Sequence, residues 1–176
     1  MEYGKNVDYR PINTLAEGSP IEFEIPGASE EYLDLGNSMS YVRMKVVKPN
    51  GNNLADADKV GPVNAFLHSL FSQVEISLNG TPVTTASDMY AYRAYIETLL
   101  SYGSDAKKSQ LTGCLFRKDK AGEFDKLDAT NPEMEWRKSF IHGSRSVDMI
   151  GRIHADLFFR DRYILNEVNV LSLIHI

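Results

Sequence analysis

Two side chains in the stretch "GRIHADLFF" have the types and the spacing of a metal-binding pair. His154 and Asp156 are two residues apart, and residues at this spacing share one face of a β-strand. Histidine nitrogens and carboxylate oxygens both bind zinc, but a protein zinc site uses three or four ligands. We therefore expect the pair to lie on the solvent-facing side of a sheet without a metal.

Cys114 is the next candidate, because a thiol beside a histidine can act as a nucleophile with its base. His142 is the base that could serve it, but no motif surrounds either residue. We expect Cys114 to be buried as a small apolar residue. A single cysteine cannot form an internal disulfide, which favours a reducing compartment.

The remaining charged clusters predict solvated surface rather than a site. Glu30 with Glu31, and Asp56 with Asp58, fall in loop-like sequence, and the run 160–162 is typical of salt bridges at a strand end. The sequence has no phosphate-binding glycine loop, no His-Glu-x-x-His and no paired cysteines. We therefore predict no catalytic residue, no cofactor and no metal, and we do not expect an enzyme.

Tyrosines crowd one predicted helix, which runs from Asp88 to Tyr102. Its expected buried stripe follows the apolar residues at helical spacing: Met89, Tyr92, Ile96, Leu99 and Leu100. Successive residues lie about 100° apart around a helix, so one sheet cannot cover every tyrosine. Because tyrosine is enriched in interface cores, we expect Tyr90, Tyr95 and Tyr102 at a subunit interface, Tyr90 first because it falls off the stripe. The alternative is that these tyrosines only pack the helix onto a sheet.

Length and charge restrict the class of protein. The 176 residues suit one domain or part of a larger one, and an apolar fraction of 43% predicts a folded chain. A net charge of −5 argues against strong nucleic-acid binding through phosphates. No apolar run approaches the about 20 residues of a membrane helix, and the first residues lack the apolar stretch of a signal peptide.

The elements that would position these residues are mostly strands. Alternating apolar residues predict short strands over 21–25 and 42–46. A helical turn over 66–71 leads directly into a strand over 74–78, and Asn79-Gly80 then predicts a tight hairpin.

Helices and a long loop are expected in the second half of the chain. A short helical turn should cover 104–111, and the polar residues 116–133 should form an exposed loop. Asn131 followed by Pro132 predicts the start of a short helix through Trp136.

The longest strand is expected over 145–161. Its dry face would carry Val147, Met149, Ile153, Leu157 and Phe159. One wet and one dry face is typical of an antiparallel sheet. Strands joined by turns, with one or two helices inserted in loops, predict an all-β antiparallel sandwich preceded by an extended arm over 1–18. A parallel α/β fold would need a regular alternation of strand and helix, which is missing.

Four long motifs occur in the order of a known family. They are "YRPINTL…SPIEFEIPGASEEYLDL", "VGPVNAFLHSLFSQVEISLNGTPVT", "YAYRAYIETLLSYGSDAKKSQL" and "HADLFFRDRYILNEVNV". On the basis of these motifs, residues 9–170 resemble the major capsid protein of Polinton (Maverick) elements and of the related adintoviruses.

The resemblance implies a structural protein with a double jelly roll, two eight-stranded sandwiches in one subunit. Residues 19–170 would then be an incomplete first jelly-roll domain, with a helical insertion near 88–111. Three subunits would form a homotrimeric capsomer of an icosahedral shell, with a minor capsid protein as a further partner. The subunit would be found in the virion, and in the nucleus or cytoplasm during assembly. The family offers no active site to transfer.

The last six residues, "LSLIHI" (171–176), match the in-frame translation of a sequencing-library adapter, CTG TCT CTT ATA CAC ATC, and the resemblance stops at Val170. We expect the natural subunit to continue past Val170 and the fragment to lack closing strands of its sandwich, leaving an unpaired edge.

Three other classes stay open. The chain could be a non-viral jelly roll that binds carbohydrate or protein, although one tryptophan and no calcium-loop pattern count against it. It could be a capsid-like protein that a host has retained for another role. A cupin-type enzyme ranks last, because it needs a cluster of histidine and carboxylate ligands.

Overall fold

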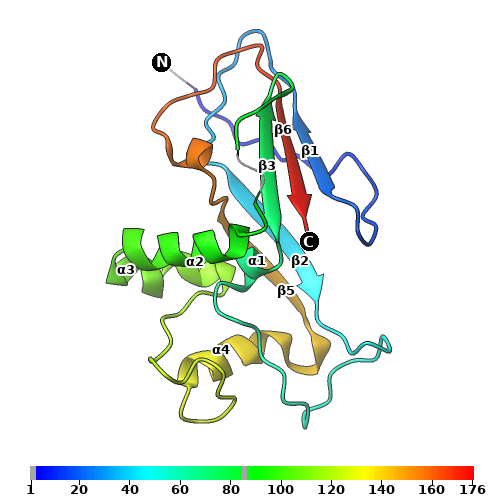
Figure 1. Ribbon diagram of the computed structural model, residues 1–176, viewed down its shortest axis with the longest axis vertical. Helices are drawn as coiled ribbons and strands as arrows, with labels where there is room; N and C mark the ends of the chain where they lie inside the picture. Colours follow the sequence, from blue (N-terminus) through cyan, green and yellow to red (C-terminus); the bar gives the residue numbers. More distant parts are fainter. Residues whose placement is uncertain (1–2, 85–86) are drawn as a thin grey trace. The chain divides into compact units, whose positions relative to one another are not determined.

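The structure is a computed structural model that describes residues 3–84 and 87–176 (Figure 1). The chain divides into two compact units. The first unit combines residues 1–38, 71–90 and 154–176, and the second combines 39–70 and 91–153. Segments distant in the sequence therefore build each unit, and the two are described separately.

The first unit contains a four-stranded antiparallel sheet. Its strands lie in the order β1-β6-β3-β4. They span Ile21–Ile25 (β1), Gln73–Leu78 (β3), Thr81–Pro82 (β4) and Val170–His175 (β6). The 3₁₀ turn η3, Asp156–Phe159, belongs to the same unit. Residues 3–18 form neither helix nor strand.

The predicted hairpin is confirmed in this sheet. β3 and β4 pair on either side of Asn79 and Gly80, whose φ angles of 47° and 78° are both left-handed. Two consecutive left-handed residues make the type I′ turn that matches the twist of a hairpin. The predicted strand over 21–25 is confirmed as β1.

The inner strand β6 contains most of the segment 171–176. It pairs with β1 on one side and with β3 on the other. Val170 and Ile174 are buried, and the strand alternates between buried and half-buried residues. Backbone ladder bonds require no particular side chain, so an apolar alternating segment fits this position whatever its origin. The foreign origin of the segment stays a prediction.

The outer edge of β1 is partly covered by the chain that precedes it. The Ile12 backbone N–H donates to the Glu22 carbonyl at 2.9 Å, and the Glu22 N–H donates to Asn13 Oδ1 at 3.0 Å. A neighbouring loop that fills edge hydrogen bonds protects a strand from pairing with other chains.

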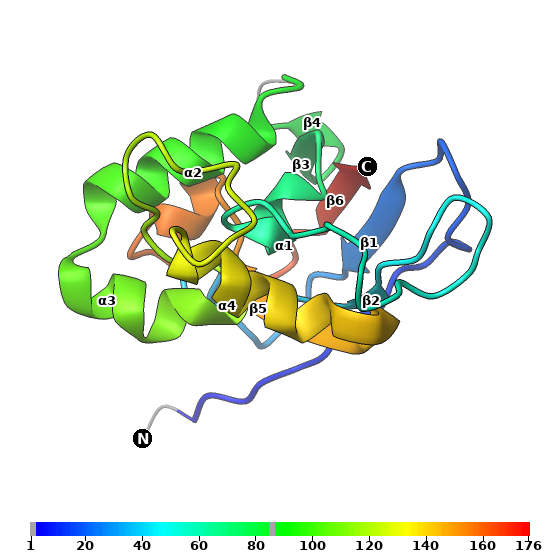
Figure 2. The same ribbon diagram turned by 90° about the horizontal axis from the view of Figure 1, so that it is seen from below.

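The second unit is built on a two-stranded antiparallel sheet and several helices. The strands are β2, Met39–Lys45, and β5, Ser146–Arg152, in register over their whole length. The helical elements are α1 (Phe66–Ser69), α2 (Tyr90–Ser101), α3 (Ser104–Lys108), η1 (Gln110–Cys114), α4 (Pro132–Ile141) and η2 (His142–Ser144). The first residue of α2, Tyr90, still belongs to the first unit. Figure 2 shows the loop between η1 and α4, drawn yellow-green, passing between α2 and α4.

The predicted faces of these two strands are confirmed. Val42 and Met44 are half-buried while Arg43 is exposed, and Val147 and Met149 of β5 are buried. The alternation expected from a sheet with one dry face therefore holds in both strands.

The long strand expected over 145–161 is less than half as long in the structure. β5 ends at Arg152, which pairs with Met39, the first residue of β2. Beyond this point no strand residue lies opposite, so the ladder cannot continue. Residues 153–155 lead instead into η3, which places Phe158 in the core.

The expected buried stripe of α2 is also wrong, because three of its members are exposed: Met89, Tyr92 and Leu100. The buried positions are Tyr90, Ala94 and Thr98, which are four residues apart and define a different face. Ala94 is fully buried on this face.

Most of the segment 116–133 is a loop, as predicted, but α4 begins at Pro132 and the loop is not exposed throughout. Phe116, Asp119 and Asn131 are buried in it. The helix predicted at Asn131-Pro132 is confirmed as α4 and extends past Trp136 to Ile141.

The described residues thus form antiparallel sheets with helices inserted between strands. The fold class is confirmed at this coarse level. Among residues 3–84 and 87–176, no helix has the length and apolarity that a bilayer crossing requires.

Candidate functional site

The second unit has an open surface pocket of about 330 Å³. Its lining comes from the segment before α1, from α2, from the loop 115–131 and from α4: Val63, Asn64, Tyr95, Asp119, Phe124, Asp125, Met134 and Arg137. This volume lies at the lower end of the range for clefts that hold a small ligand or a side chain, about 300–1,000 Å³.

A buried ion pair forms one wall of the pocket. Arg137 of α4 is fully buried, and its Nη2 donates to both carboxylate oxygens of Asp119, at 3.0 and 3.2 Å. Arg137 Nε donates to the Pro62 carbonyl at 3.1 Å. A buried pair of charges is tolerated only when further hydrogen bonds satisfy both partners, which the Pro62 carbonyl begins to do.

Asn64 completes the surroundings of the carboxylate. Its Nδ2 donates to Asp119 Oδ2 at 2.9 Å and to the Arg117 carbonyl, while its Oδ1 accepts from the N–H groups of Ala65 and Arg117 at 2.9 and 3.0 Å. One amide therefore ties the segment before α1 to the loop 115–131. These bonds fix the position of Asp119 in the wall.

One donor of this wall lacks a partner. Arg137 Nη1 is buried and forms no hydrogen bond to the described residues. An unsatisfied buried donor costs about 1–3 kcal/mol, so native proteins contain few of them and often at functional sites.

The mouth of the pocket is aromatic and acidic. Phe124 is 48% exposed, and its neighbour Asp125 is exposed. Burial, and then the Asp119 carboxylate, raise the pKa of Tyr95 above its usual value, while Arg137 acts in the opposite direction. The Tyr95 hydroxyl therefore titrates in an environment that disfavours further negative charge.

A second set of contacts between this loop and α4 is made by Arg117. Its guanidinium carbon lies 4.2 Å from the centroid of the Trp136 ring, and its Nη1 lies 3.2 Å from Glu133 Oε2. A cation over an indole face with a carboxylate partner orients both elements. The loop that carries the pocket's acidic residues is thus attached to α4 at two places, through Asp119 and through Arg117.

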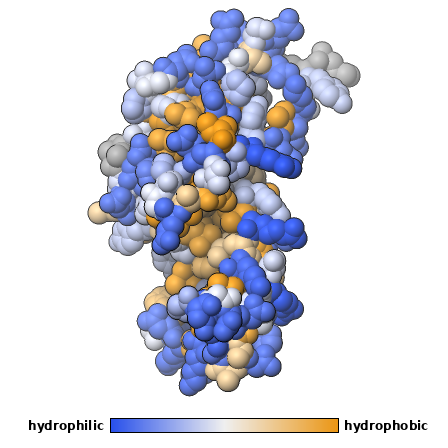
Figure 3. All heavy atoms as spheres, turned by 90° about the vertical axis from the view of Figure 1, so that its right-hand side faces the viewer, coloured by the Kyte–Doolittle hydropathy of each residue, from blue (hydrophilic) through white to orange (hydrophobic). Residues whose placement is uncertain are grey.

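A second feature is the exposed face of the β2–β5 sheet. Tyr41 and Ile150 are cross-strand partners, and they are 60% and 49% exposed; Met39 on the same face is 60% exposed. The Tyr41 hydroxyl donates to Asp148, which also pairs with Arg43 Nε at 3.1 Å. Apolar side chains are visible from outside in the space-filling view as well (Figure 3). An apolar group on a sheet face can be covered by another protein surface.

The predicted metal pair does not lie on a solvent-facing strand. His154 is buried after the end of β5, and its backbone N–H donates to the Tyr90 hydroxyl at 3.2 Å, while Asp156 is exposed at the start of η3. No cluster of three or more possible metal ligands occurs among residues 3–84 and 87–176.

Cys114 and His142 are not brought together by a hydrogen bond. Cys114 is buried, as predicted, and its thiol donates to the Leu111 carbonyl at 3.0 Å. His142 is exposed, with Nε2 lying 3.1 Å from Asp56 Oδ1. Burial raises the pKa of the Cys114 thiol from 9.0 to about 11, so the reactive thiolate is scarce at neutral pH.

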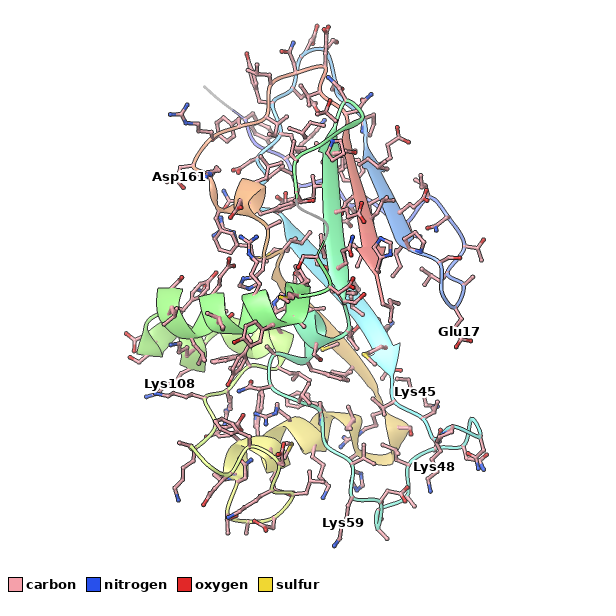
Figure 4. All side chains as sticks on the ribbon, viewed as in Figure 1. Glu17, Lys45, Lys48, Lys59, Lys108 and Asp161 are labelled. Carbon is pink, nitrogen blue, oxygen red and sulfur yellow. The ribbon has the colours of Figure 1, made fainter. Side chains whose placement is uncertain are left out.

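The other charged clusters are mostly surface residues. Lys48 pairs with Asp58 at 2.8 Å, a contact on the loop that follows β2 (Figure 4). Glu31 pairs with Lys5. The run 160–162 forms no ion pair within the described part of the chain and follows η3 rather than a strand, so the predicted salt-bridge cluster is wrong.

The three tyrosines expected at an interface have different surroundings. Tyr90 is 6% exposed, with its ring centroid 6.3 Å from that of Phe71. A side chain buried inside its own subunit cannot face a partner, so this expectation is corrected. Tyr95 is half-buried in the pocket wall, with its ring centroid 6.3 Å from that of Phe116, and Tyr102 is half-buried after α2.

Sequence reasoning missed the Asp119–Arg137 pair and the pocket above it. Asp119 was placed in an exposed loop, and Arg137 lies one residue past the expected end of the helix at Trp136. The pair Asn131-Pro132 could have revealed it, because it marks the first turn of α4. Counting from that turn places Met134 and Arg137, three residues apart, on the same face of the helix.

The comparisons with known proteins give one relative. No family model matches the sequence, and no solved structure matches it. The chain is similar to the uncharacterized protein F54H12.2 of Caenorhabditis elegans, with 29% identity over 164 residues. The match covers 88% of this chain, and the chain spans 36% of the length of that relative. The name of the relative specifies no activity, substrate or partner.

Proposed function

We propose that this chain is part of a structural capsid subunit, and that it acts by self-association rather than by catalysis. The observation that carries the proposal is a group of exposed apolar side chains at one end of the β2–β5 sheet, Met39, Tyr41 and Ile150. Subunit interfaces of stable assemblies are large and more apolar than the rest of a protein surface. The four sequence motifs of the capsid-protein family support the same function.

The finer elements of the proposal follow from that resemblance. The two antiparallel sheets would belong to an incomplete first jelly roll, three subunits would form a capsomer, and a minor capsid protein would join the shell. The subunit would occur in the virion and, during assembly, in the nucleus or cytoplasm. The net charge of −5 is consistent with a shell protein that does not hold nucleic acid tightly.

The oligomeric state tests the proposal, with a matched pair of variants. Tyr41→Lys places a charge on the apolar face, next to Asp148, which can pair with it and preserve the fold. Tyr163→Lys makes the same change at an equally exposed tyrosine, 62% exposed, in the first unit. Sedimentation velocity should show trimers or larger assemblies for the unsubstituted chain and for Tyr163→Lys. Tyr41→Lys should weaken the association at least about tenfold, because the charged lysine must lose its water when an apolar partner surface covers it.

Two results would contradict the proposal. An unsubstituted chain that stays monomeric up to about 100 µM, well above the dissociation constants of stable interfaces, would contradict self-association through the β2–β5 sheet. Equal association of Tyr41→Lys and Tyr163→Lys would show that the β2–β5 face is not the contact. Circular dichroism of both variants separates loss of association from loss of folding.

A protein-binding module is the second candidate function. The pocket favours it, because a cavity with aromatic, acidic and amide groups can receive a side chain of a partner. This candidate does not require that the chain assembles with itself.

A further inference from the structure

The groups that are accessible at the pocket are aromatic and acidic. Phe124 and Val63 are about half exposed at the rim, and the Tyr95 ring and the Met134 sulfur lie deeper in the lining. Aromatic faces carry negative electrostatic potential and attract cations. A thioether adds a soft, polarizable surface that accepts varied ligand shapes.

The charges around the pocket do not cancel at its mouth. Arg137 and Asp119 neutralise each other in the wall, and neither is exposed enough to face solvent freely. Asp125 is exposed and forms no ion pair with any of residues 3–84 and 87–176.

The acidic rim is held in place before any ligand arrives. The Glu123 N–H donates to the Lys120 carbonyl at 3.1 Å, and the Lys126 N–H donates to the Glu123 carbonyl at 3.2 Å. Asn131 Nδ2 donates to the same Glu123 carbonyl at 2.7 Å. These bonds enclose Phe124 and Asp125 in consecutive turns, and a preorganised rim loses little entropy on binding.

We infer that this pocket binds a basic side chain, a lysine or an arginine, presented by a peptide segment of a protein partner. The apolar stem of such a side chain packs against the rings of Phe124 and Tyr95, and the charged end pairs with Asp125. An anionic ligand is disfavoured, because Asp119 and Asp125 repel it while Arg137 is already paired and fully buried. A purely apolar side chain would leave Asp125 without a counter-charge.

Matched peptides test the inference on the complete chain. The probes are acetyl-Gly-Arg-Gly-amide and acetyl-Gly-citrulline-Gly-amide, which have nearly the same shape but differ by one charge. Titration followed by NMR should give saturable shifts with the arginine peptide. The citrulline peptide should bind about tenfold more weakly, because a cation near a carboxylate and aromatic rings gains roughly 1–2 kcal/mol.

Two rim variants and one control locate the binding. Asp125→Asn and Phe124→Ala change exposed residues, so both proteins should fold, and each should lower the affinity for the arginine peptide about fivefold or more. Asp161→Asn removes an equally exposed carboxylate on a loop of the first unit, where its side chain points away from the ribbon (Figure 4), and should leave the affinity unchanged.

Three results would overturn the inference. They are equal affinities of the two peptides, binding that Asp125→Asn and Phe124→Ala leave intact, and the absence of saturable shifts at about 10 mM peptide, well beyond a 1 mM dissociation constant. The pocket lies within one chain, so peptide binding does not require self-association. Sedimentation velocity on the same samples therefore tests the proposed capsid function independently.

Discussion

Replacement of Asp119 by alanine tests whether the buried ion pair holds the second unit together. The change removes the acceptor of three hydrogen bonds, two from Arg137 and one from Asn64. It leaves a guanidinium that is fully buried with only the Pro62 carbonyl and the Met134 sulfur as partners. Breaking a buried pair in this way costs about 3–5 kcal/mol, and we expect a loss of that size in the free energy of unfolding.

The loss would be a large fraction of the total stability of a domain, about 5–15 kcal/mol. Urea unfolding at pH 7 measures it, with fluorescence of the single Trp136 as the reporter, since that ring packs under Arg117 in the same loop-to-helix contact. Lys120→Ala is the matched control, because Lys120 is exposed and Glu123 keeps Lys126 as a second partner, so the change should cost less than about 1 kcal/mol.

The double variant Asp119→Leu with Arg137→Met separates two explanations. If an unpaired buried charge causes the loss, replacing both partners by apolar groups should recover most of it. An Asp119→Ala protein that loses no more stability than Lys120→Ala would refute the reasoning, since the carboxylate would then be dispensable.

Two further predictions concern single positions. Cys114 should resist thiol reagents at pH 8 in the folded protein and react readily in urea. The reason is that a pKa of about 11 in the folded protein leaves about 0.1% of the thiol as thiolate at pH 8. Fast labelling of the folded chain would contradict the burial of Cys114. The same raised pKa means that its contribution to stability is present below pH 9 and is lost as the pH rises towards 11, which pH-dependent melting would show. Gly27→Ala should destabilise the first unit by more than about 1 kcal/mol, because a Cβ there would lie 2.5 Å from backbone atoms of Glu167 and Val168, which cannot move aside as a side chain would. Thermal unfolding measures this loss of stability. Gly18→Ala is unsuitable as a control, because the φ of +76° at Gly18 would strain an alanine there.

Short-range signals predicted much of the local structure. Asn79-Gly80 specifies its turn through two residues that tolerate left-handed φ angles. Asn131 caps α4 by accepting a hydrogen bond from the Met134 N–H at 3.1 Å. These features depend on a few adjacent residues, and the sequence contains all of them.

Features that depend on distant neighbours were not predictable in the same way. The end of β5 at Arg152 is set by the length of β2, which lies more than one hundred residues earlier in the sequence. The buried face of α2 could have been either of two stripes, because its tyrosines suit both a core and a surface. Tyr90 is in the core because Phe71 and the backbone of His154 lie against it.

The loop 115–131 explains why polar composition did not reveal the pocket. A polar residue can be buried at little cost when each of its groups has a partner, and the partners are supplied by elements far along the chain. Asn131 is 1% exposed, but its amide donates to the Glu123 carbonyl while its oxygen caps α4. Asp119 is buried because Arg137, 18 residues later, reaches it from α4. The same polar residues would have been exposed without those partners. A charged loop followed by a capped helix is therefore a place to look for buried ion pairs, and the pocket follows from the space that such a pair keeps open between the loop and the helix.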